Sequence, residues 1–247
     1  MVFQILPLCV IAFFAATVGS MVGGSTLITV PALILFGIPP HQAIGTSRFS
    51  TTFLALSSSA NYIRNKKVNL HQALLFALIM STGAILGANV VIRTRPEVIK
   101  TIISILIILT AFFMLIRRES GLKQKMVNFT AKRKIMAALL AFSLGVYGGF
   151  FGGIGPFLIA SFIFFMGSTF LQARGNSSLI GFIWSSLATV VFLRNNLVIF
   201  KIAIPLSISM ILGAWIGSSF ALKIGNLWVR RLFIVFIIIL AIKTAFS

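Results

Sequence analysis

Small and hydroxyl residues follow two glycine pairs, and this part of the sequence is the best suited to binding an anion. Ser25 and Thr26 come directly after Gly23-Gly24, and Gly152-Gly153-Ile154-Gly155-Pro156 stands in a comparable place later in the chain. Glycine lets the backbone bend, hydroxyls are preferred helix caps, and proline suits the first helical turn. A helix that begins there has free N–H groups and the positive end of its dipole. We therefore expect an anion site at these two helix starts.

A second pair of glycine and polar residues shows the same symmetry. Gly45-Thr46-Ser47 and Gly175-Asn176-Ser177 each stand where a long helix is expected to begin. Arg48 follows inside an apolar segment, where it either neutralises a substrate or extends to the membrane interface. Arg174, beside the second group, is expected at the interface. The alternative for the glycines and serines is close helix packing alone.

These positions form the predicted substrate site. Its members are Gly23, Gly24, Ser25, Thr26, Gly45, Thr46, Ser47, Arg48, Gly153, Gly155, Gly175, Asn176 and Ser177.

The composition predicts a polytopic membrane protein. The 247 residues include 21 Lys and Arg against 2 Asp and Glu, with 59% hydrophobic and 9% charged residues. Soluble domains average about 45–50% apolar and about 25% charged residues. Such a chain is neither a soluble nucleic-acid binder nor disordered. Because Glu97 and Glu119 are the only acids, we expect no carboxylate-based enzyme, no metal site and no cofactor.

Apolar segments of the chain predict an all-α fold. Two of them, 25–38 and 155–170, have fewer than the ~20 residues that a helix needs to span the bilayer, and they would extend only ~21–24 Å. Each follows a glycine pair, so we expect broken or re-entrant helices. The ten segments are 3–22, 25–38, 43–62, 70–92, 98–116, 135–153, 155–170, 175–192, 198–222 and 229–246.

An internal repeat accounts for the matching positions of the short segments. A shift of 130 residues superimposes Gly45 on Gly175, Arg64-Asn65 on Arg194-Asn195, and Gly83 on Gly213. We predict two homologous halves, 1–117 and 135–247, joined by a basic linker over 118–134.

The distribution of basic residues favours inverted halves. An antiparallel arrangement places 13 Lys and Arg on one side and 4 on the other, against 11 and 6 for a parallel one. The positive-inside rule then places the linker in the cytoplasm and both termini outside. Short, glycine-interrupted segments in inverted repeats are typical of secondary transporters.

The first half also resembles the TauE/SafE sulfite exporter family. The resemblance rests on 18–25 (VGSMVGGS), Val30-Pro31 and 37–47 (GIPPHQAIGTS), and the run 147–155 (YGGFFGGIG) resembles the repeated motif. It implies a bacterial-type inner-membrane permease for sulfite, organosulfonates or related sulfur-containing anions. The sequence thus predicts alternating-access transport of a small anion across the lipid bilayer, with a membrane scaffold without transport activity as the alternative. The oligomeric state stays open, a homodimer included.

Overall fold

The computed structural model describes residues 2–99, 101–102, 105 and 130–245, and these are helices and their connections. Most of the expected segment 98–116 and the linker up to Phe129 lie outside the described residues. α9 consists of two helices that meet at a non-helical Gly225. The labelled helices are α1 (Val2–Val22), α2 (Thr26–Leu35), α3 (Pro40–Arg64), α4 (Leu70–Arg93), α6 (Ala131–Phe150), α7 (Gly155–Met166), α8 (Phe170–Arg194) and α9 (Phe200–Ala245).

Local capping sets where the two central helices begin. Pro39 and Pro40 open α3, and proline is favoured at such a start. Thr169 and Gln172 form a reciprocal capping box at the start of α8. Both helices therefore begin about five residues before Gly45 and Gly175. The expectation that these glycines open their helices is wrong, because their N–H groups lie within a formed helical turn.

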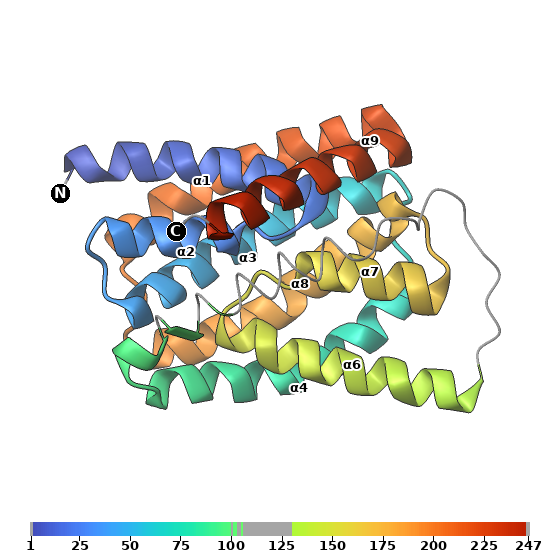
Figure 1. Cartoon of the computed structure of the whole chain (residues 1–247), viewed down its shortest axis with the longest axis horizontal. Coiled ribbons are helices and arrows are strands. Elements are labelled where there is room, and N and C mark those ends of the chain that lie inside the picture. Colours follow the sequence, from blue (N-terminus) through green and yellow to red (C-terminus); the bar gives the residue numbers. More distant parts are fainter. Residues whose placement is uncertain (1, 100, 103–104, 106–129, 246–247) are drawn as a thin grey trace.

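The helices form a bundle with α3 and α8 in contact at its centre (Figure 1). α1 packs along α9 on one flank, and α4 packs along α6 on the other. α3 also contacts α9, and α8 contacts α4. Helices far apart in the sequence are thus neighbours, and at each flank a helix that lies before residue 100 packs against one that lies after residue 130.

Close backbone approach explains the small-residue spacing of α4 and α9. A Cβ atom at Gly83 or Gly87 would lie 2.4 or 2.0 Å from a carbonyl oxygen of α6. A Cβ atom at Gly213 or Gly217 would lie 2.3 or 2.1 Å from a carbonyl oxygen of α1. Only glycine permits these contacts. These four glycines therefore allow the close packing of α4 on α6 and of α9 on α1.

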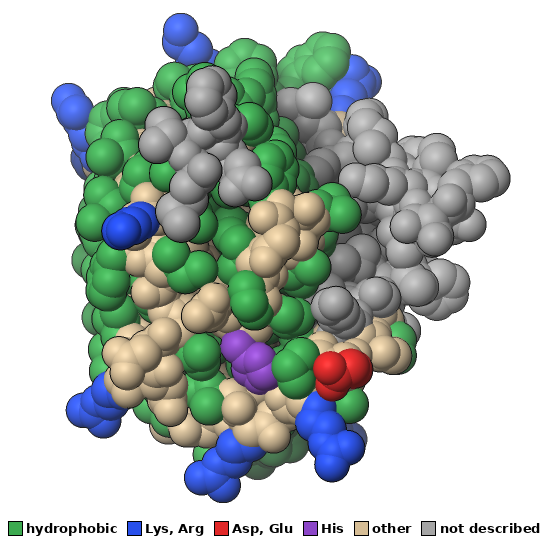
Figure 2. All heavy atoms as spheres, turned by 90° about the vertical axis from the view of Figure 1, so that its left-hand side faces the viewer, with side chains coloured by type: hydrophobic (Ala, Val, Ile, Leu, Met, Phe, Trp, Pro, Cys, Tyr) green, Lys and Arg blue, Asp and Glu red, His purple; other side chains and the backbone are tan. Residues whose placement is uncertain are grey.

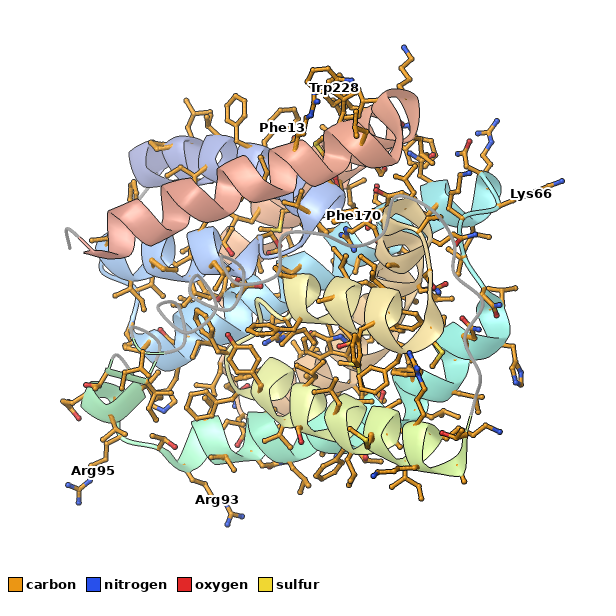
Figure 3. All side chains as sticks on the ribbon, turned by 45° about the vertical axis from the view of Figure 1, so that its right-hand side comes forward. Phe13, Lys66, Arg93, Arg95, Phe170 and Trp228 are labelled. Atoms are coloured by element: carbon orange, nitrogen blue, oxygen red, sulfur yellow. The ribbon has the colours of Figure 1, made fainter. Side chains whose placement is uncertain are left out.

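The two short helices return toward the end from which the preceding long helix came. The N-terminus and the turn between α2 and α3 lie at the same end of the bundle (Figure 1). α6 and α8 both begin at the opposite end. α4 runs from the end that carries Lys66 to the end that carries Arg93 and Arg95 (Figure 3). Segments 25–38 and 155–170 therefore belong to hairpins within the bundle.

The surface and the helix lengths fit a membrane environment. Within the residues that the structure describes, four helical segments are long and apolar enough to cross a bilayer: Ile5–Val22, Leu70–Arg93, Phe170–Arg194 and Phe200–Gly225. Figure 2 looks onto one end of the bundle and shows hydrophobic side chains along its flank, with basic side chains projecting singly. α3 is more polar because it is enclosed by other helices; Asn61, for example, donates to Ser218 Oγ of α9 at 2.8 Å.

Candidate anion-binding site

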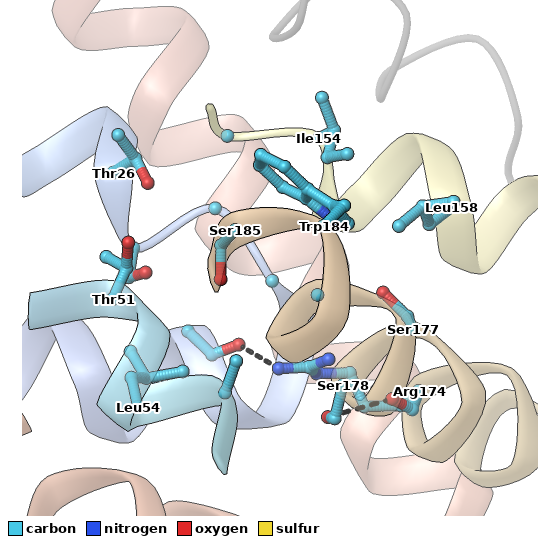
Figure 4. A pocket seen from close by; sticks show the side chains of 18 of the residues that line it. Thr26, Thr51, Leu54, Ile154, Leu158, Arg174, Ser177, Ser178, Trp184 and Ser185 are labelled. Atoms are coloured by element: carbon cyan, nitrogen blue, oxygen red, sulfur yellow. Dashed lines mark hydrogen bonds between the residues drawn. The ribbon is translucent and has the colours of Figure 1, made fainter. Parts of the chain in front are cut away.

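A cavity of about 80 Å³ lies midway along α3 and α8, beside the breaks that follow α1 and α6 (Figure 4). α3 contributes Arg48 and Thr51 to its wall, and α8 contributes Arg174, Ser178 and Trp184. All five side chains are buried. Of the predicted site, the cavity wall includes Gly23, Gly24, Ser25, Thr26, Arg48, Gly153, Gly155 and Ser177.

Four glycines produce the two breaks. Gly23 and Gly24 have φ values of +86° and +84°, and Gly152 and Gly153 have +95° and +69°. These left-handed conformations favour glycine strongly over residues with a Cβ atom. The tips of the two broken helices, residues 23–26 and 152–155, also touch. A Cβ atom at Gly155 would lie 2.7 Å from the Cα atom of Gly23. The two broken helices therefore meet backbone to backbone.

Free backbone donors remain at both tips. In the described part of the chain, the N–H groups of Gly24, Ser25 and Thr26 donate no hydrogen bond. The same holds for Gly153–Gly155, and Pro156 stands in the first turn of α7 as expected. The expected capping by hydroxyls is wrong for Ser25, whose side chain forms no cap bond to α2. The breaks thus offer N–H groups and two positive helix ends to the cavity.

Arg48 lies inside the bundle and not at the membrane interface. Its side chain is 2% exposed, and Nη2 donates to the carbonyl oxygen of Gly148 at 2.6 Å. The guanidinium carbon stands 4.7 Å from the ring centroid of Trp184. The snorkelling alternative is therefore excluded for Arg48, and a positive group faces the cavity from α3.

Arg174 is also buried, which corrects the expectation of an interface position. It is 4% exposed; Nε donates to Ser20 O at 2.9 Å and Nη2 donates to Gly19 O at 2.8 Å. These carbonyls belong to the last turn of α1, where a cation interacts favourably with the helix dipole. Arg174 therefore fixes the end of α1 from the other half of the chain.

The cavity is positive because its two arginines have no acidic partner among the described residues. Glu97, the described acid, is exposed on the surface. An unpaired charge is expensive inside a bundle, so each arginine is a candidate for a functional role. In that same part of the chain, no group of three or more His, Cys, Asp or Glu side chains could hold a metal.

The second pair of predicted motifs, residues 45–47 of α3 and 175–177 of α8, lies beside the cavity and packs these two helices against neighbouring segments. A Cβ atom at Gly45 would lie 2.4 Å from Leu197 O, and one at Gly175 would lie 2.5 Å from Lys67 O. Thr46 Oγ1 accepts from the N–H of Ile199 at 3.1 Å. These residues hold α3 against the turn between α8 and α9, and α8 against the turn between α3 and α4.

Asn176, Ser47 and Ser177 are the other residues of these motifs. The first two contact neighbouring segments, and the third lines the cavity. Asn176 Oδ1 accepts from the N–H of Asn69 at 2.7 Å, in the position that Thr46 takes in the first half. Ser47 Oγ lies 2.8 Å from Thr29 Oγ1 of α2. Ser177 alone among the six lines the cavity.

Sequence reasoning missed several residues of the cavity wall. Thr51 follows Arg48 by three positions and Ser178 follows Arg174 by four, so helical spacing could have found both. Ser185, which accepts from Thr52 Oγ1 at 3.1 Å, sits two further turns along α8. Trp184 carried no such signal, since a tryptophan in an apolar segment is more typical of the membrane interface.

Comparison with known proteins defines the class of protein. The model of the family described as sulfite exporter TauE/SafE matches residues 8–244, so the chain belongs to this family of membrane transporters. This assignment removes support from the alternative of a scaffold without transport activity.

Individual relatives agree with that class. A "probable membrane transporter protein ORF9" of Sinorhizobium sp is 32% identical over 96% of this chain and 90% of its own length. A "probable membrane transporter protein" of Haemophilus influenzae is 24% identical over 96% of this chain and 92% of its own length. The "probable membrane transporter protein YfcA" of Escherichia coli K12 is 25% identical over 96% and 88%. No solved structure matches the chain.

Proposed function

We propose that this transporter is an anion permease whose substrate is sulfite, an organosulfonate or a related small sulfur-containing oxyanion. The observation that carries the proposal is the positive cavity between two broken helices. Two buried arginines without an acidic partner among the described residues, and six backbone N–H groups that donate no hydrogen bond there, surround it. Donors of this kind stabilise an anion and disfavour a cation.

The substrate site is the part of the predicted set that surrounds the cavity. Gly23, Gly24, Gly153 and Gly155 allow the backbone to approach the anion, and Ser25, Thr26 and Ser177 add hydroxyls. Arg48 supplies charge. Gly45, Thr46, Ser47, Gly175 and Asn176 support this site by joining the central helices to their neighbours.

The halves are proposed to be inverted repeats, 1–117 and 135–247, on either side of the linker 118–134. Matching contacts support this: Thr46 accepts from Ile199 N–H, and 130 residues away Asn176 accepts from Asn69 N–H. Gly45 and Gly175 approach Leu197 and Lys67 in the same manner. Rocking of one half against the other would then expose the cavity to each side in turn.

Orientation follows from the basic residues at the two ends of the bundle. The end that carries Arg64, Lys66 and the basic start of α6 is proposed to face the cytoplasm of a cell with an inner membrane. The linker would lie on the same side. Arg93, Arg95 and Arg194 would then face outward.

Flux into proteoliposomes tests the proposal. Purified protein should transport sulfite or an organosulfonate across the bilayer faster than protein-free liposomes do, and the flux should follow an imposed membrane potential because charge moves. Arg95→Gln, at an exposed position on one end of the bundle, serves as the control variant. Absence of flux for sulfite, methanesulfonate, taurine and thiosulfate would contradict the proposed substrates.

A further inference from the structure

Two buried side-chain donors in the described part of the chain have no hydrogen-bond partner, and the residues that carry them both line the cavity. They are Nε of Arg48 and Nε1 of Trp184. The side chains are 2% and 4% exposed. Buried donors are rarely left unpaired in folded proteins. Two such donors in one cavity wall call for a common explanation.

The two groups are stacked, and neighbouring contacts fix how they lie. The guanidinium carbon of Arg48 stands 4.7 Å from the ring centroid of Trp184, a cation–π contact. Nη2 of Arg48 is held by the carbonyl oxygen of Gly148 at 2.6 Å. A donor that is already oriented loses less freedom when a ligand binds.

Glycines of the second half leave room for this stack. A Cβ atom at Gly152 would lie 3.1 Å from Nη1 of Arg48. A Cβ atom at Gly148 would lie 3.2 Å from the ring of Trp184. Both distances are tighter than ordinary packing allows. The motif 147–155 therefore makes the space that the stacked pair occupies, in addition to breaking the helix.

The other cavity arginine has a different use. Arg174 donates through Nε and Nη2 to two carbonyls of α1. Its Nε, the atom that is free in Arg48, is thus occupied. The two arginines divide their roles, with Arg174 positioning a helix end and Arg48 keeping a donor for a ligand.

We propose that Nε–H of Arg48 and Nε1–H of Trp184 bind two oxygens of one oxyanion. This inference rests on the proposed function and adds the donor pair that recognises the substrate. Sulfite, sulfate and sulfonate groups carry neighbouring oxygens around one atom, so they can accept from two stacked donors together. Chloride is a single sphere without that arrangement. The pair therefore selects oxyanions over halides of the same sign.

Two conservative substitutions separate hydrogen bonding from charge and shape. Trp184→Phe keeps an aromatic ring beneath the guanidinium and removes the N–H group. Arg48→Lys keeps the positive charge and removes the planar Nε–H donor. Trp215→Phe and Arg194→Lys are the matched controls, because both side chains are exposed and neither lines the cavity.

Dissociation constants test this pair of donors. They are measured for sulfite, methanesulfonate and chloride on the purified protein in detergent. Each cavity variant should bind sulfite and methanesulfonate about 10-fold or more weakly, the effect of losing one hydrogen bond to a charged group. Trp184→Phe should leave chloride affinity unchanged. Both controls should bind all three anions as the wild type does.

The outcomes distinguish this inference from the function on which it rests. Wild-type oxyanion affinity in both cavity variants would overturn the donor pair and leave an anion transporter with another site. An equal loss for chloride and sulfite in Trp184→Phe would also overturn it. Absence of binding and flux in the wild-type chain would overturn the proposed function itself. The thermal unfolding midpoint without ligand shows whether each variant is folded, and Arg48→Lys tests the pair independently if Trp184→Phe does not fold.

Discussion

Arg48 and Arg174 face the same cavity from α3 and α8, and their surroundings differ in a way that assigns different roles. Arg174 has two hydrogen bonds to the last turn of α1. Arg48 has one, to Gly148 near the end of α6, and it stacks on Trp184 with Nε unpaired. Arg48 of α3 thus contacts the end of α6, and Arg174 of α8 contacts the end of α1. The number of occupied donors is therefore the basis on which Arg174 is assigned a structural role and Arg48 the proposed role of binding a ligand.

The largest expected effect comes from removing the structural arginine. Arg174→Gln leaves the carbonyls of Gly19 and Ser20 without their strong donors, which should lower the free energy of unfolding by about 2–3 kcal/mol. Thermal unfolding in detergent measures the change. Arg194→Gln, on the exposed end of the same helix, should leave the midpoint unchanged. If Arg174→Gln is as stable as the wild type, its assignment as a cap is wrong.

Separating the two helix tips should disturb both arginines together. Gly155→Ala introduces a Cβ atom that would lie 2.7 Å from Gly23 Cα, and backbone on both sides must move. Overpacking of this kind destabilises by about 1–3 kcal/mol, and flux should fall because the cavity changes shape.

A second glycine of the same cavity provides the stability control. A Cβ atom at Gly181 would meet Ala55 at an ordinary 3.7 Å, so Gly181→Ala should unfold at the wild-type temperature. Equal unfolding midpoints for the two alanine variants would contradict the tight contact of the tips.

Removing Arg48, the arginine whose Nε is unpaired, should sharpen the contrast with Arg174. Arg48→Gln takes an uncompensated charge out of the bundle, so the unfolding midpoint should stay the same or rise. Anion affinity should fall about 10-fold or more because a charged donor is lost. Calorimetry with sulfite measures the affinity, and Arg95→Gln is the exposed control. Loss of stability with unchanged affinity would reverse the roles given to Arg48 and Arg174.

The smallest effect is expected at Tyr62, which supports the same helix end as Arg174. Its hydroxyl donates to Ser20 O at 3.0 Å, a carbonyl that also accepts from Arg174. Tyr62→Phe should lower the free energy of unfolding by about 1 kcal/mol, since Ser20 keeps its other donor. A loss larger than that of Arg174→Gln in the same thermal assay would show that Tyr62 is the main support of α1.

The broken helices could be predicted from the sequence because their cause is local. Glycine pairs at Gly23-Gly24 and Gly152-Gly153 need no distant partner to permit left-handed backbone, and the structure places positive φ at all four. The packing role of Gly83 and Gly87 was equally accessible from spacing. The start of α8 could have been found too, since Thr169 and Gln172 have the spacing of a capping box.

The role of the second motif pair could not be predicted in this way. Gly45 and Gly175 are followed by polar residues just as Gly23-Gly24 is, yet they pack against carbonyls of Leu197 and Lys67. The partner residues lie more than 100 positions away in the sequence. Composition alone does not distinguish a glycine that faces a ligand from one that faces a distant turn.

The sequence by itself determined the membrane class, the repeated order of long and short helices, and the family resemblance that the comparison confirmed across residues 8–244. Hydrophobicity, glycine conformation and charge distribution are properties of short stretches of chain. Only the tertiary structure decided that Arg48 keeps a free donor, that Arg174 caps α1, and that Trp184 belongs to the cavity. Those roles depend on which carbonyls and rings surround each side chain, and these surroundings form where helices distant in the sequence meet.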